Sequence, residues 1–270
     1  MRDNVLAAIE AYYDAVPRNA AQPEDLSPFV LFVPRGAAWP YYARPQLGAA
    51  SFTAAEVERV RERQRELRIP EAFEWVAETT PGLRAAALES GLTVSDHALM
   101  PLIGEPSSGP EPPLGLTLRL VTSQEDLGLL RAVSNVGFSF PGTGRGDAGS
   151  EHASRAIGER NLEREAFARE RLEQELTIMA AAIVDDEPVA VGSHQPVEGV
   201  TEIVGVATLP AFRRRGIGAA LTAFLTADAR ARGIETVFLS AGDDDVARMY
   251  ERVGFQRIGT ACIAEPGEHR

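Results

Sequence analysis

The chain has 270 residues, of which 44% are hydrophobic and 24% charged, a balance that excludes a fibrous protein and wholesale disorder. It carries 27 basic residues, all of them arginine, against 39 acidic residues, so the net charge is −12. This charge argues against a nucleic-acid binder that works through a basic face. The absence of lysine excludes both a Schiff-base lysine and a P-loop lysine.

The single cysteine, Cys262, excludes an intrachain disulfide framework and a multi-cysteine metal site. Its apolar neighbours predict a buried strand residue. Residues 1–17 are acidic and polar and lack the basic start and apolar core of a signal peptide. No run approaches the ~20 apolar residues of a membrane span, so we expect a soluble cytoplasmic protein.

The length exceeds that of a typical domain of roughly 100–150 residues, so two domains are expected. The clearest boundary lies at 101–115, where five prolines, three glycines and two serines occur in fifteen residues. Such a segment resists both helix and sheet. We therefore predict a first α/β domain at 1–110, a linker within 101–116 and a second domain at 117–270.

The first half has a less regular pattern than the second. Its apolar runs predict a hairpin from 29–33 and 39–43, and Thr53 is placed to cap a charged helix that ends near Leu67. Further elements are predicted as a strand at 72–76, a helix at 81–90 and a strand at 92–99.

The second half alternates strands and helices, which predicts an α/β layer built on one central sheet. Ser123 is placed to cap a helix that runs to Val136, a glycine-rich loop follows at 137–150, and a charged helical stretch spans 151–175. The remaining elements are predicted as strands at 116–121, 177–184, 188–195, 201–208, 235–240 and 256–264 and helices at 216–232 and 243–253.

The two halves share a weak repeat of a helix–strand–helix–strand unit. The strand near residue 75 follows Thr53 at about the spacing at which the strand near residue 238 follows Gly216. A glycine ends the second helix of each copy. We interpret this as an internal repeat. Chance is the competing explanation, because many α/β units have this order and spacing of helices and strands.

The most informative stretch is 201–225, TEIVGVATLPAFRRRGIGAALTAFL. An alternating strand ends at Thr208, and three arginines and two glycines then open an amphipathic helix. A helix N-terminus has unpaired N–H groups and about half a positive charge, and glycine lets a ligand approach the backbone closely. Arginines add charge for phosphate, so the stretch predicts a pyrophosphate-binding site.

Three phosphate-binding motifs have to be separated. A P-loop needs lysine, and a dinucleotide fingerprint needs a third glycine, whereas Ala219, Ala220 and Leu221 follow Gly218. The remaining pattern, Arg-x-x-Gly-x-Gly between a strand and a helix, resembles the acetyl-CoA-binding signature of the GNAT acyltransferases.

The following helix supports this resemblance. The family commonly reads Asn-x-x-Ala-x-x-Leu-Tyr-x-x-x-Gly-Phe there, and this chain has Tyr250 followed by Gly254-Phe255. Asp243 replaces the usual Asn and Val246 the usual Ala. Because an acid disfavours contact with an anionic cofactor, we expect Asp243 to act as an N-cap.

The resemblance covers about residues 117–265. It implies a GNAT fold, with a central mixed sheet flanked by helices, and a degenerate GNAT-like N-terminal half. It also implies acetyl-CoA as co-substrate, with its pantetheine arm paired to the strand end and its pyrophosphate on the helix N–H groups. The cofactor-binding residues implied are Val206, Ala207, Thr208, Arg213, Arg214, Arg215, Gly216, Ile217, Gly218 and Ala219.

Two catalytic residues are predicted, Tyr250 and Glu202. The resemblance implies that Tyr250 protonates the leaving thiolate, whereas packing of its ring on the sheet is the alternative. A lysine-like amine is neutral in only about 1 molecule in 2,500 at pH 7, a cost of about 4.6 kcal/mol, so a general base helps. Glu202 lies at the offset where lysine-acetylating relatives place a glutamate; an exposed strand-end glutamate and His194 are the alternatives.

By period two, Glu202 is expected to share a face with Val204, Val206 and Thr208. The glycine-rich loop is expected to border the acceptor site as a mobile segment. The chain is thus interpreted as an acetyl-CoA-dependent N-acetyltransferase that uses direct transfer to a small-molecule or peptide amine. A non-catalytic CoA-sensing or partner-binding protein, and an enzyme for a longer acyl group, are the alternatives. The acceptor and the oligomeric state stay open.

Overall fold

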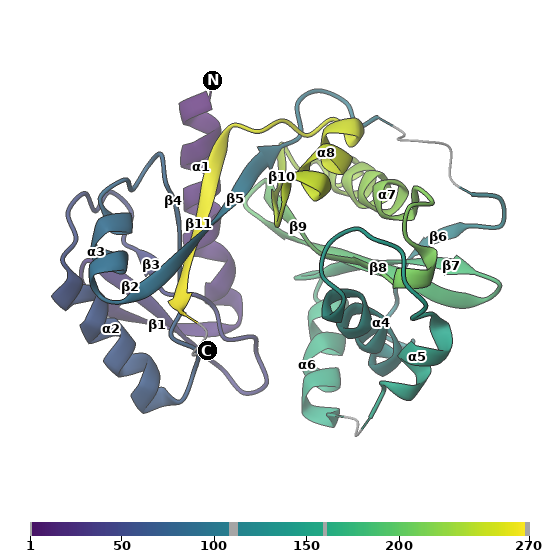
Figure 1. Cartoon of the computed structure of the whole chain (residues 1–270), viewed down its shortest axis with the longest axis horizontal. Helices are drawn as coiled ribbons and strands as arrows, with labels where there is room; N and C mark the ends of the chain where they lie inside the picture. The colour runs from purple at the N-terminus through teal and green to yellow at the C-terminus, as the bar shows by residue number, and fades with distance from the viewer. Residues whose placement is uncertain (1, 108–112, 159–160, 268–270) are drawn as a thin grey trace. The chain divides into compact units, whose positions relative to one another are not determined.

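The computed structural model describes residues 2–107, 113–158 and 161–267 and divides into two compact units (Figure 1). Unit 1 comprises residues 1–99 and 257–270, and unit 2 comprises residues 100–256. This division differs from the predicted domains, because the C-terminal strand belongs to unit 1 rather than to the second domain.

Unit 1 contains two sheets. One is antiparallel with the order β1-β2-β3, and the other has the antiparallel order β4-β11-β5. The elements are α1 (Arg2–Ala15), the 3-10 turn η1 (Val16–Asn19), β1 (Ala21–Leu26), β2 (Phe29–Pro34), β3 (Arg44–Pro45), α2 (Ala54–Leu67), β4 (Phe73–Val76), α3 (Leu83–Glu89), β5 (Leu92–Pro101) and β11 (Gly259–Pro266).

The predicted hairpin between 29–33 and 39–43 is displaced along the chain. On one edge, β2 pairs antiparallel with β3 at Phe29↔Pro45 and Val30↔Arg44, just after the predicted second strand. On its other edge, β2 pairs with β1, which the sequence did not predict, over the register from Ala21↔Pro34 to Leu26↔Phe29. The sequence of β1, AQPEDL, contains proline and two acids and has low intrinsic strand propensity, so neighbouring backbone rather than local preference makes it a strand.

The strand β11 joins unit 1 through backbone pairing on both of its sides. Cys262 lies opposite Trp75 of β4 and opposite Asp96 of β5. The prediction of a buried strand cysteine is confirmed, since Cys262 is fully buried. Burial raises the pKa of its thiol to about 11, so the sulfur stays protonated at neutral pH.

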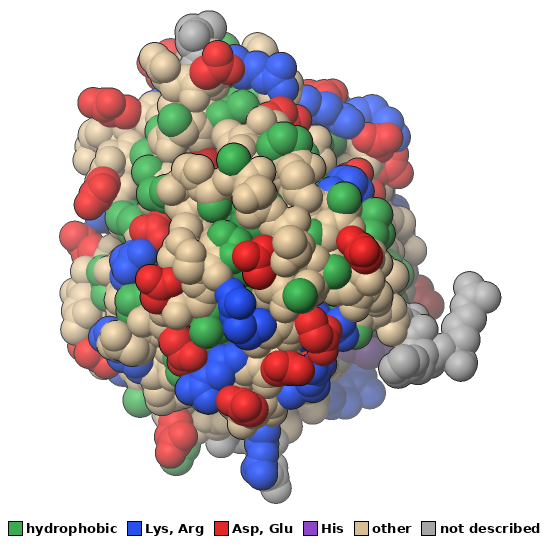
Figure 2. Space-filling model, turned by 90° about the vertical axis from the view of Figure 1, so that its left-hand side faces the viewer, with side chains coloured by type: hydrophobic (Ala, Val, Ile, Leu, Met, Phe, Trp, Pro, Cys, Tyr) green, Lys and Arg blue, Asp and Glu red, His purple; other side chains and the backbone are tan. Residues whose placement is uncertain are grey.

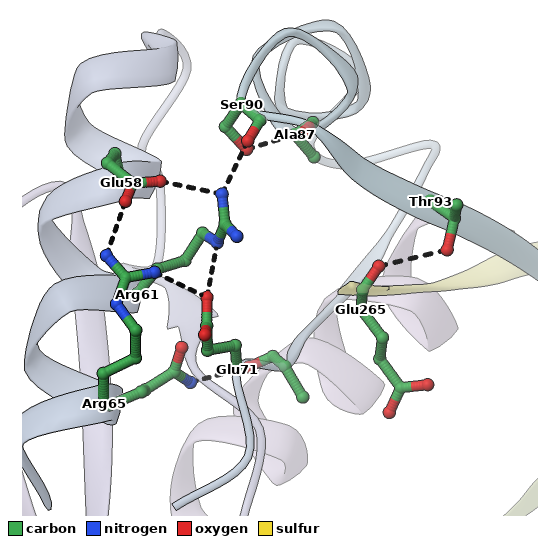
Figure 3. Close-up of polar contacts among 10 residues, drawn as sticks. Glu58, Arg61, Arg65, Glu71, Ala87, Ser90, Thr93 and Glu265 are labelled. Atoms are coloured by element: carbon green, nitrogen blue, oxygen red, sulfur yellow. Dashed lines mark hydrogen bonds and ion pairs between the residues drawn. The ribbon is translucent and has the colours of Figure 1, made fainter. Parts of the chain in front are cut away.

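The helix α2 is held to its surroundings by an ion-pair network (Figure 3). Arg61 contacts Glu58 at 2.7 Å and Glu71 at 2.8 Å and donates to the carbonyl of Ser90 at 2.6 Å. Arg65 contacts the same two glutamates. The network ties α2 to the segment before β4 and to the end of α3.

The surface of unit 1 alternates in charge. Figure 2 looks onto the side drawn at the left of Figure 1, and on its described part acidic and basic side chains are interspersed rather than gathered by sign. Ion pairs within unit 1 include Arg63 with Glu24 and Glu66, at 2.8 and 2.9 Å.

Unit 2 is built on a mixed sheet with the order β10-β9-β8-β7-β6, parallel between β10 and β9 and antiparallel elsewhere. Figure 1 draws α7 and α8 on one side of this sheet and α4 to α6 on the other. The elements are β6 (Thr117–Leu120), α4 (Leu127–Ser139), α5 (Ser150–Arg155), α6 (Leu162–Glu173), β7 (Ile178–Val184), β8 (Glu187–Val197), β9 (Val200–Thr208), the 3-10 turn η2 (Pro210–Phe212), α7 (Ile217–Ala231), β10 (Thr236–Ala241) and α8 (Asp244–Val253).

Two helix starts differ from prediction. Asp126 rather than Ser123 caps α4, because its carboxylate accepts hydrogen bonds at 3.1 and 3.2 Å from two N–H groups of the first turn. The stretch predicted as one helix over 151–175 forms α5 and α6, and Asn161 caps the second of these.

The first residues of the predicted linker are part of unit 2. The N–H of Leu102 donates to the carbonyl of Val237 at 2.8 Å, and that of Ser107 donates to the carbonyl of Val253 at 2.9 Å. Residues 108–112 of the predicted linker lie outside the described residues.

A β-bulge interrupts β9 at Gly205. The register passes from Ser193↔Val204 to Val191↔Ala207, which leaves one extra residue on β9. Gly205 has φ +65°, in the left-handed region that favours glycine. The bulge lies between the start of β9 and its end at Thr208, so it sets the direction of the strand end.

Replacement of Gly205 tests this bulge. No heavy atom of the described residues lies within 4 Å of an added Cβ, so the backbone conformation alone restricts the position. Gly205→Ala should cost about 1–2 kcal/mol of unfolding free energy, and Gly205→Asn should cost less because asparagine tolerates this region. Urea unfolding measures both values. Equal costs for the two variants would contradict a left-handed Gly205.

Candidate functional site

The start of α7 lies directly after the end of β9. Gly216, with φ +78°, is the N-cap, and no side chain accepts a hydrogen bond from the first turn of α7 within the described residues. The free N–H groups of that turn and the helix dipole favour an anion. The backbone from Arg214 to Ala219 therefore has the chemistry predicted for a pyrophosphate-binding site.

The helix α2 of unit 1, which the predicted repeat aligns with α7, has its start capped by its own side chains. Thr53 accepts from the N–H of Glu56 at 3.2 Å, while the Glu56 carboxylate accepts from the N–H of Thr53 at 2.8 Å. This capping box places a carboxylate where α7 has none. The nearby cation Arg59 donates to the carbonyls of Leu26 and Ser27, so it too is engaged within unit 1.

The strand β9 exposes part of one edge next to this helix start. Within the described residues, its ladder with β10 covers Val200, Thr201 and Glu202. On its other edge, β8 pairs with β9 as far as Thr208. The backbone from Val206 to Thr208 thus lies beyond the β10 ladder, where an extended ligand can pair with it.

The face of the sheet on which Glu202 lies follows from the bulge. Because Val191 and Ser193 of β8 point to one face, their partners Ala207 and Val204 point to that face as well. Glu202, two residues before Val204, belongs to the same face, and its side chain is half-buried.

The prediction that Glu202 shares a face with Val206 and Thr208 is wrong, because the extra residue reverses the alternation. A Cβ placed on Gly218 of α7 would lie 3.6 Å from the Thr208 hydroxyl, which puts Thr208 on the α7 side. A Cβ on Gly137 of α4 would lie 2.9 Å from the Cβ of Ala207. The isolated glycine inside the strand pattern was the signal for this bulge.

The sequence predicted that Arg213 binds the phosphate of the cofactor, but in the structure its side chain binds backbone carbonyls instead. Its guanidinium makes five hydrogen bonds, as many as it has N–H groups. The acceptors are the backbone carbonyls of Thr208 (3.1 Å), Gly142 (2.8 Å), Gly144 (3.3 Å), Gly137 (2.6 Å) and Phe140 (2.8 Å). Burial lowers the pKa of Arg213 from its usual value.

The other two arginines differ from Arg213 and from each other. Arg215 donates to the carbonyl of Ala211 at 3.2 Å, and its guanidinium lies 5.2 Å from the ring centre of Phe212. Arg214 is exposed and makes no hydrogen bond to another described residue. Arg215 is exposed as well, so Arg214 differs from it in having no hydrogen-bond partner among the described residues.

Tyr250 lies in α8, whose N-terminus is capped as expected by Asp243 at 2.8 Å from the N–H of Val246. Its ring packs edge-on against Phe255 with the ring centres 6.0 Å apart. Burial raises the pKa of Tyr250 above its ordinary value, so the hydroxyl is neutral at physiological pH. Both the packing and the proton-donor interpretation are compatible with this environment.

His194 is fully enclosed. Its Nδ1 lies 3.1 Å from the Thr201 hydroxyl and its Nε2 lies 3.0 Å from Asp228 of α7, which also pairs with Arg232 at 2.6 Å. Burial lowers the pKa of His194 despite the carboxylate. Both ring nitrogens are engaged, so this histidine joins α7 to the sheet rather than serving as an accessible base.

The glycine-rich loop after α4 is tied to the segment between β9 and α7. The N–H of Gly146 donates to the carbonyl of Pro210 at 3.2 Å, and the N–H of Ala211 donates to the carbonyl of Ala148 at 3.1 Å. Arg145, Gly146, Asp147 and Ala211 line an open hollow. Sequence reasoning gave no sign of this connection, because the partners are backbone groups distant along the chain.

The described residues include no group of three or more His, Cys, Asp and Glu side chains arranged to hold a metal. None of the described helices has both the length and the apolar character needed to cross a bilayer.

Comparison with known proteins gives a family match for part of the chain and similar solved structures for most of it. Residues 150–255, from α5 to the end of α8, match the family model described as the acetyltransferase (GNAT) family. No curated protein matches the chain. Several solved structures are similar to it over most of its length.

A GCN5-related N-acetyltransferase from Kribbella flavida is 26% identical over 98% of this chain and 96% of its own, with a TM-score of 0.71. One from Sphaerobacter thermophilus is 20% identical over 80% and 68%, with a TM-score of 0.51. A tandem GNAT protein from the clavulanic acid biosynthesis pathway is 15% identical over 90% and 79%, with a TM-score of 0.53. These similarities confirm the predicted α/β GNAT fold.

Gly218 offers a test of the anion site. A Cβ there makes ordinary contacts, 3.6 Å from the Thr208 hydroxyl and 4.0 Å from the Met249 methyl, whereas φ +78° strains any replacement of Gly216. Gly218→Glu should bring a carboxylate close to the free N–H groups, one position nearer to the N-cap than Glu56 is in α2. We expect CoA to bind wild type at one site per chain and to bind the variant at least about tenfold more weakly.

The control is Gly218→Gln, which adds nearly the same volume without charge. Calorimetry should show that CoA binds Gly218→Gln more tightly than Gly218→Glu, with a difference that shrinks as salt is raised. If wild type and Gly218→Glu bind CoA with the same affinity, CoA does not bind at this helix start.

Proposed function

Because residues 150–255 form a domain of the GNAT acetyltransferase family, we propose that the protein is an acetyl-CoA-dependent N-acetyltransferase. In the proposed reaction an amine attacks the thioester carbonyl, a C–N bond forms, the C–S bond breaks, and the amide and free CoA leave. Transfer is direct, since the chain's one cysteine is buried in unit 1 with its pKa raised.

The observation that carries this proposal is the uncapped start of α7 beside the open edge of β9. The free N–H groups of Arg214 to Ala219 suit the pyrophosphate, and Arg214 adds an exposed positive charge. The backbone of Val206 to Thr208 suits the pantetheine arm, whose amides can pair as a strand does. The two features adjoin each other along the chain.

Two side chains supply proton transfer in this proposal. Tyr250 is kept neutral by burial, so its hydroxyl has a proton to donate to the leaving sulfur. Glu202 is the proposed base that accepts a proton from the attacking amine. It lies on β9 where the ladder with β10 ends, opposite Phe238.

Turnover of acetyl-CoA with a panel of amines tests the proposal. The panel should include polyamines, aminoglycosides and short peptides with free N-termini, and released thiol should be measured against hydrolysis in water. We expect at least one amine to raise the rate above hydrolysis. Binding of CoA with no turnover, for acetyl and longer acyl groups alike, would support the non-catalytic CoA-binding alternative.

Tyr250→Phe tests the proton donor. The substitution keeps the ring and its edge-on contact with Phe255, so stability and CoA affinity should change little. Loss of the hydroxyl should lower kcat by roughly 10–10³-fold, because thiolate departure gains from proton donation without requiring it. Steady-state kinetics and thermal unfolding decide. An unchanged kcat with reduced stability would make Tyr250 a packing residue only.

Glu202→Gln tests the base. The variant should lose most kcat/KM at neutral pH and recover in part as pH rises, since free amine then accumulates without help. Glu187→Gln is the matched control, because Glu187 is an exposed residue at the start of β8. A constant ratio of variant to wild-type rate between pH 6 and 9 would exclude Glu202 from this role.

A further inference from the structure

We propose that Arg213 is a positioning residue that couples the ligand-binding backbone at 214–219 to the glycine-rich loop at 137–148. In this view, occupation of the helix start by CoA orders the loop, and an ordered loop strengthens CoA binding. The inference rests on the proposed function, because CoA is the ligand expected at 214–219.

The contacts of the Arg213 guanidinium carry this inference. Four of its five hydrogen bonds go to carbonyls at the end of α4 and in the loop, at 2.6 to 3.3 Å. The fifth returns to Thr208 at the end of β9. One planar side chain thus joins three segments, and a charged donor makes each bond stronger than a neutral one would be.

The loop is held by packing at its far end, where Ala148 is buried, whereas its middle is held through Arg213. It contains glycine at 142, 144 and 146, and Gly142 has φ +74°. Its backbone ties to the segment between β9 and α7 are the two bonds that involve Gly146 and Ala148. Without the guanidinium, the carbonyls of Gly142 and Gly144 would have to rely on water.

Coupling to the ligand follows from the position of Arg213 in the chain. Arg214 has φ +61° and Gly216 has φ +78°, so two left-handed residues set the direction of Arg213 relative to α7. A ligand that accepts hydrogen bonds from the N–H groups of 214–219 fixes these dihedral angles. Coupling free energies are reciprocal. If CoA binding stabilises the ordered loop, the ordered loop increases the affinity for CoA by the same factor.

The loop also begins beside the end of β9, where the thioester is proposed to bind. Gly137 approaches Ala207 so closely that a Cβ would lie 2.9 Å from the Ala207 Cβ. The next aromatic residues, Phe138 and Phe140, are 61% and 46% exposed. Order in this segment therefore fixes two apolar side chains beside the strand end at which the thioester is proposed to bind.

Hydrogen exchange of the full-length protein, with CoA as the probe, tests the coupling. In wild type, CoA should slow exchange across 137–148 as well as across 214–219. Arg213→Lys keeps the charge but replaces the planar fork with one ammonium group. Exchange across 137–148 should then be about tenfold faster without CoA, and the slowing by CoA should be confined to 214–219.

Arg145→Lys is the matched control, because Arg145 lies in the same loop and its guanidinium makes no hydrogen bond to another described residue. It should preserve the CoA-dependent protection of wild type. Loop exchange raised equally with and without CoA in Arg213→Lys would show a purely structural role and overturn the coupling.

Two further outcomes distinguish a failure of this inference from a failure of the proposed function. If calorimetry shows no CoA binding to wild type, the proposed function itself fails. If wild type binds CoA and protects 214–219 but not 137–148, the coupling fails while the proposed function stands. The second comparison uses wild type alone, so it decides even if Arg213→Lys does not fold.

Discussion

A helix leaves its first N–H groups without intrahelical partners, and the residue before the helix determines what satisfies them. At α7 that residue is Gly216, which has no side chain to offer and adopts φ +78°. Donors at this position can be satisfied by water or by a ligand. Other features of unit 2 determine the position of this helix start. The strand β9 ends directly before it, the bulge at Gly205 sets the direction of β9, and His194 holds α7 against the sheet.

The start of α2 in unit 1 has a different N-cap, because Thr53 is extended and forms a capping box with Glu56, whereas Gly216 is left-handed and has no side chain. Glu56 returns its carboxylate to the N–H of Thr53, so the start of α2 is satisfied internally and repels a second anion. The ion pairs of Arg61 and Arg65 further along α2 hold the helix against its own unit. The N-cap residue and the third residue of the helix therefore determine whether a helix start has free N–H groups.

The sequence predicted features that depend on local chemistry and missed those that depend on distant backbone. The caps at Thr53 and Asp243, the strand β9 and the helix α7 follow from short-range patterns. The pairing of β1 with β2 and the place of β11 between β4 and β5 do not, because sheet partners are chosen by long-range hydrogen bonding. The face of Glu202 was predicted wrongly, since one extra residue at the Gly205 bulge reverses the alternation.

The three adjacent arginines show why a motif alone does not assign roles to its residues. Charge counting gives Arg213, Arg214 and Arg215 the same expected partner, a phosphate. The backbone turns sharply at Arg214, where φ is +61°, and thereby separates the directions of its neighbours. Arg213 donates to backbone carbonyls, Arg215 lies over Phe212, and Arg214 makes no hydrogen bond to another described residue. The dihedral angle at one residue thus separates a structural cation from the one proposed to face the ligand, and the number of charges in the sequence does not predict that angle.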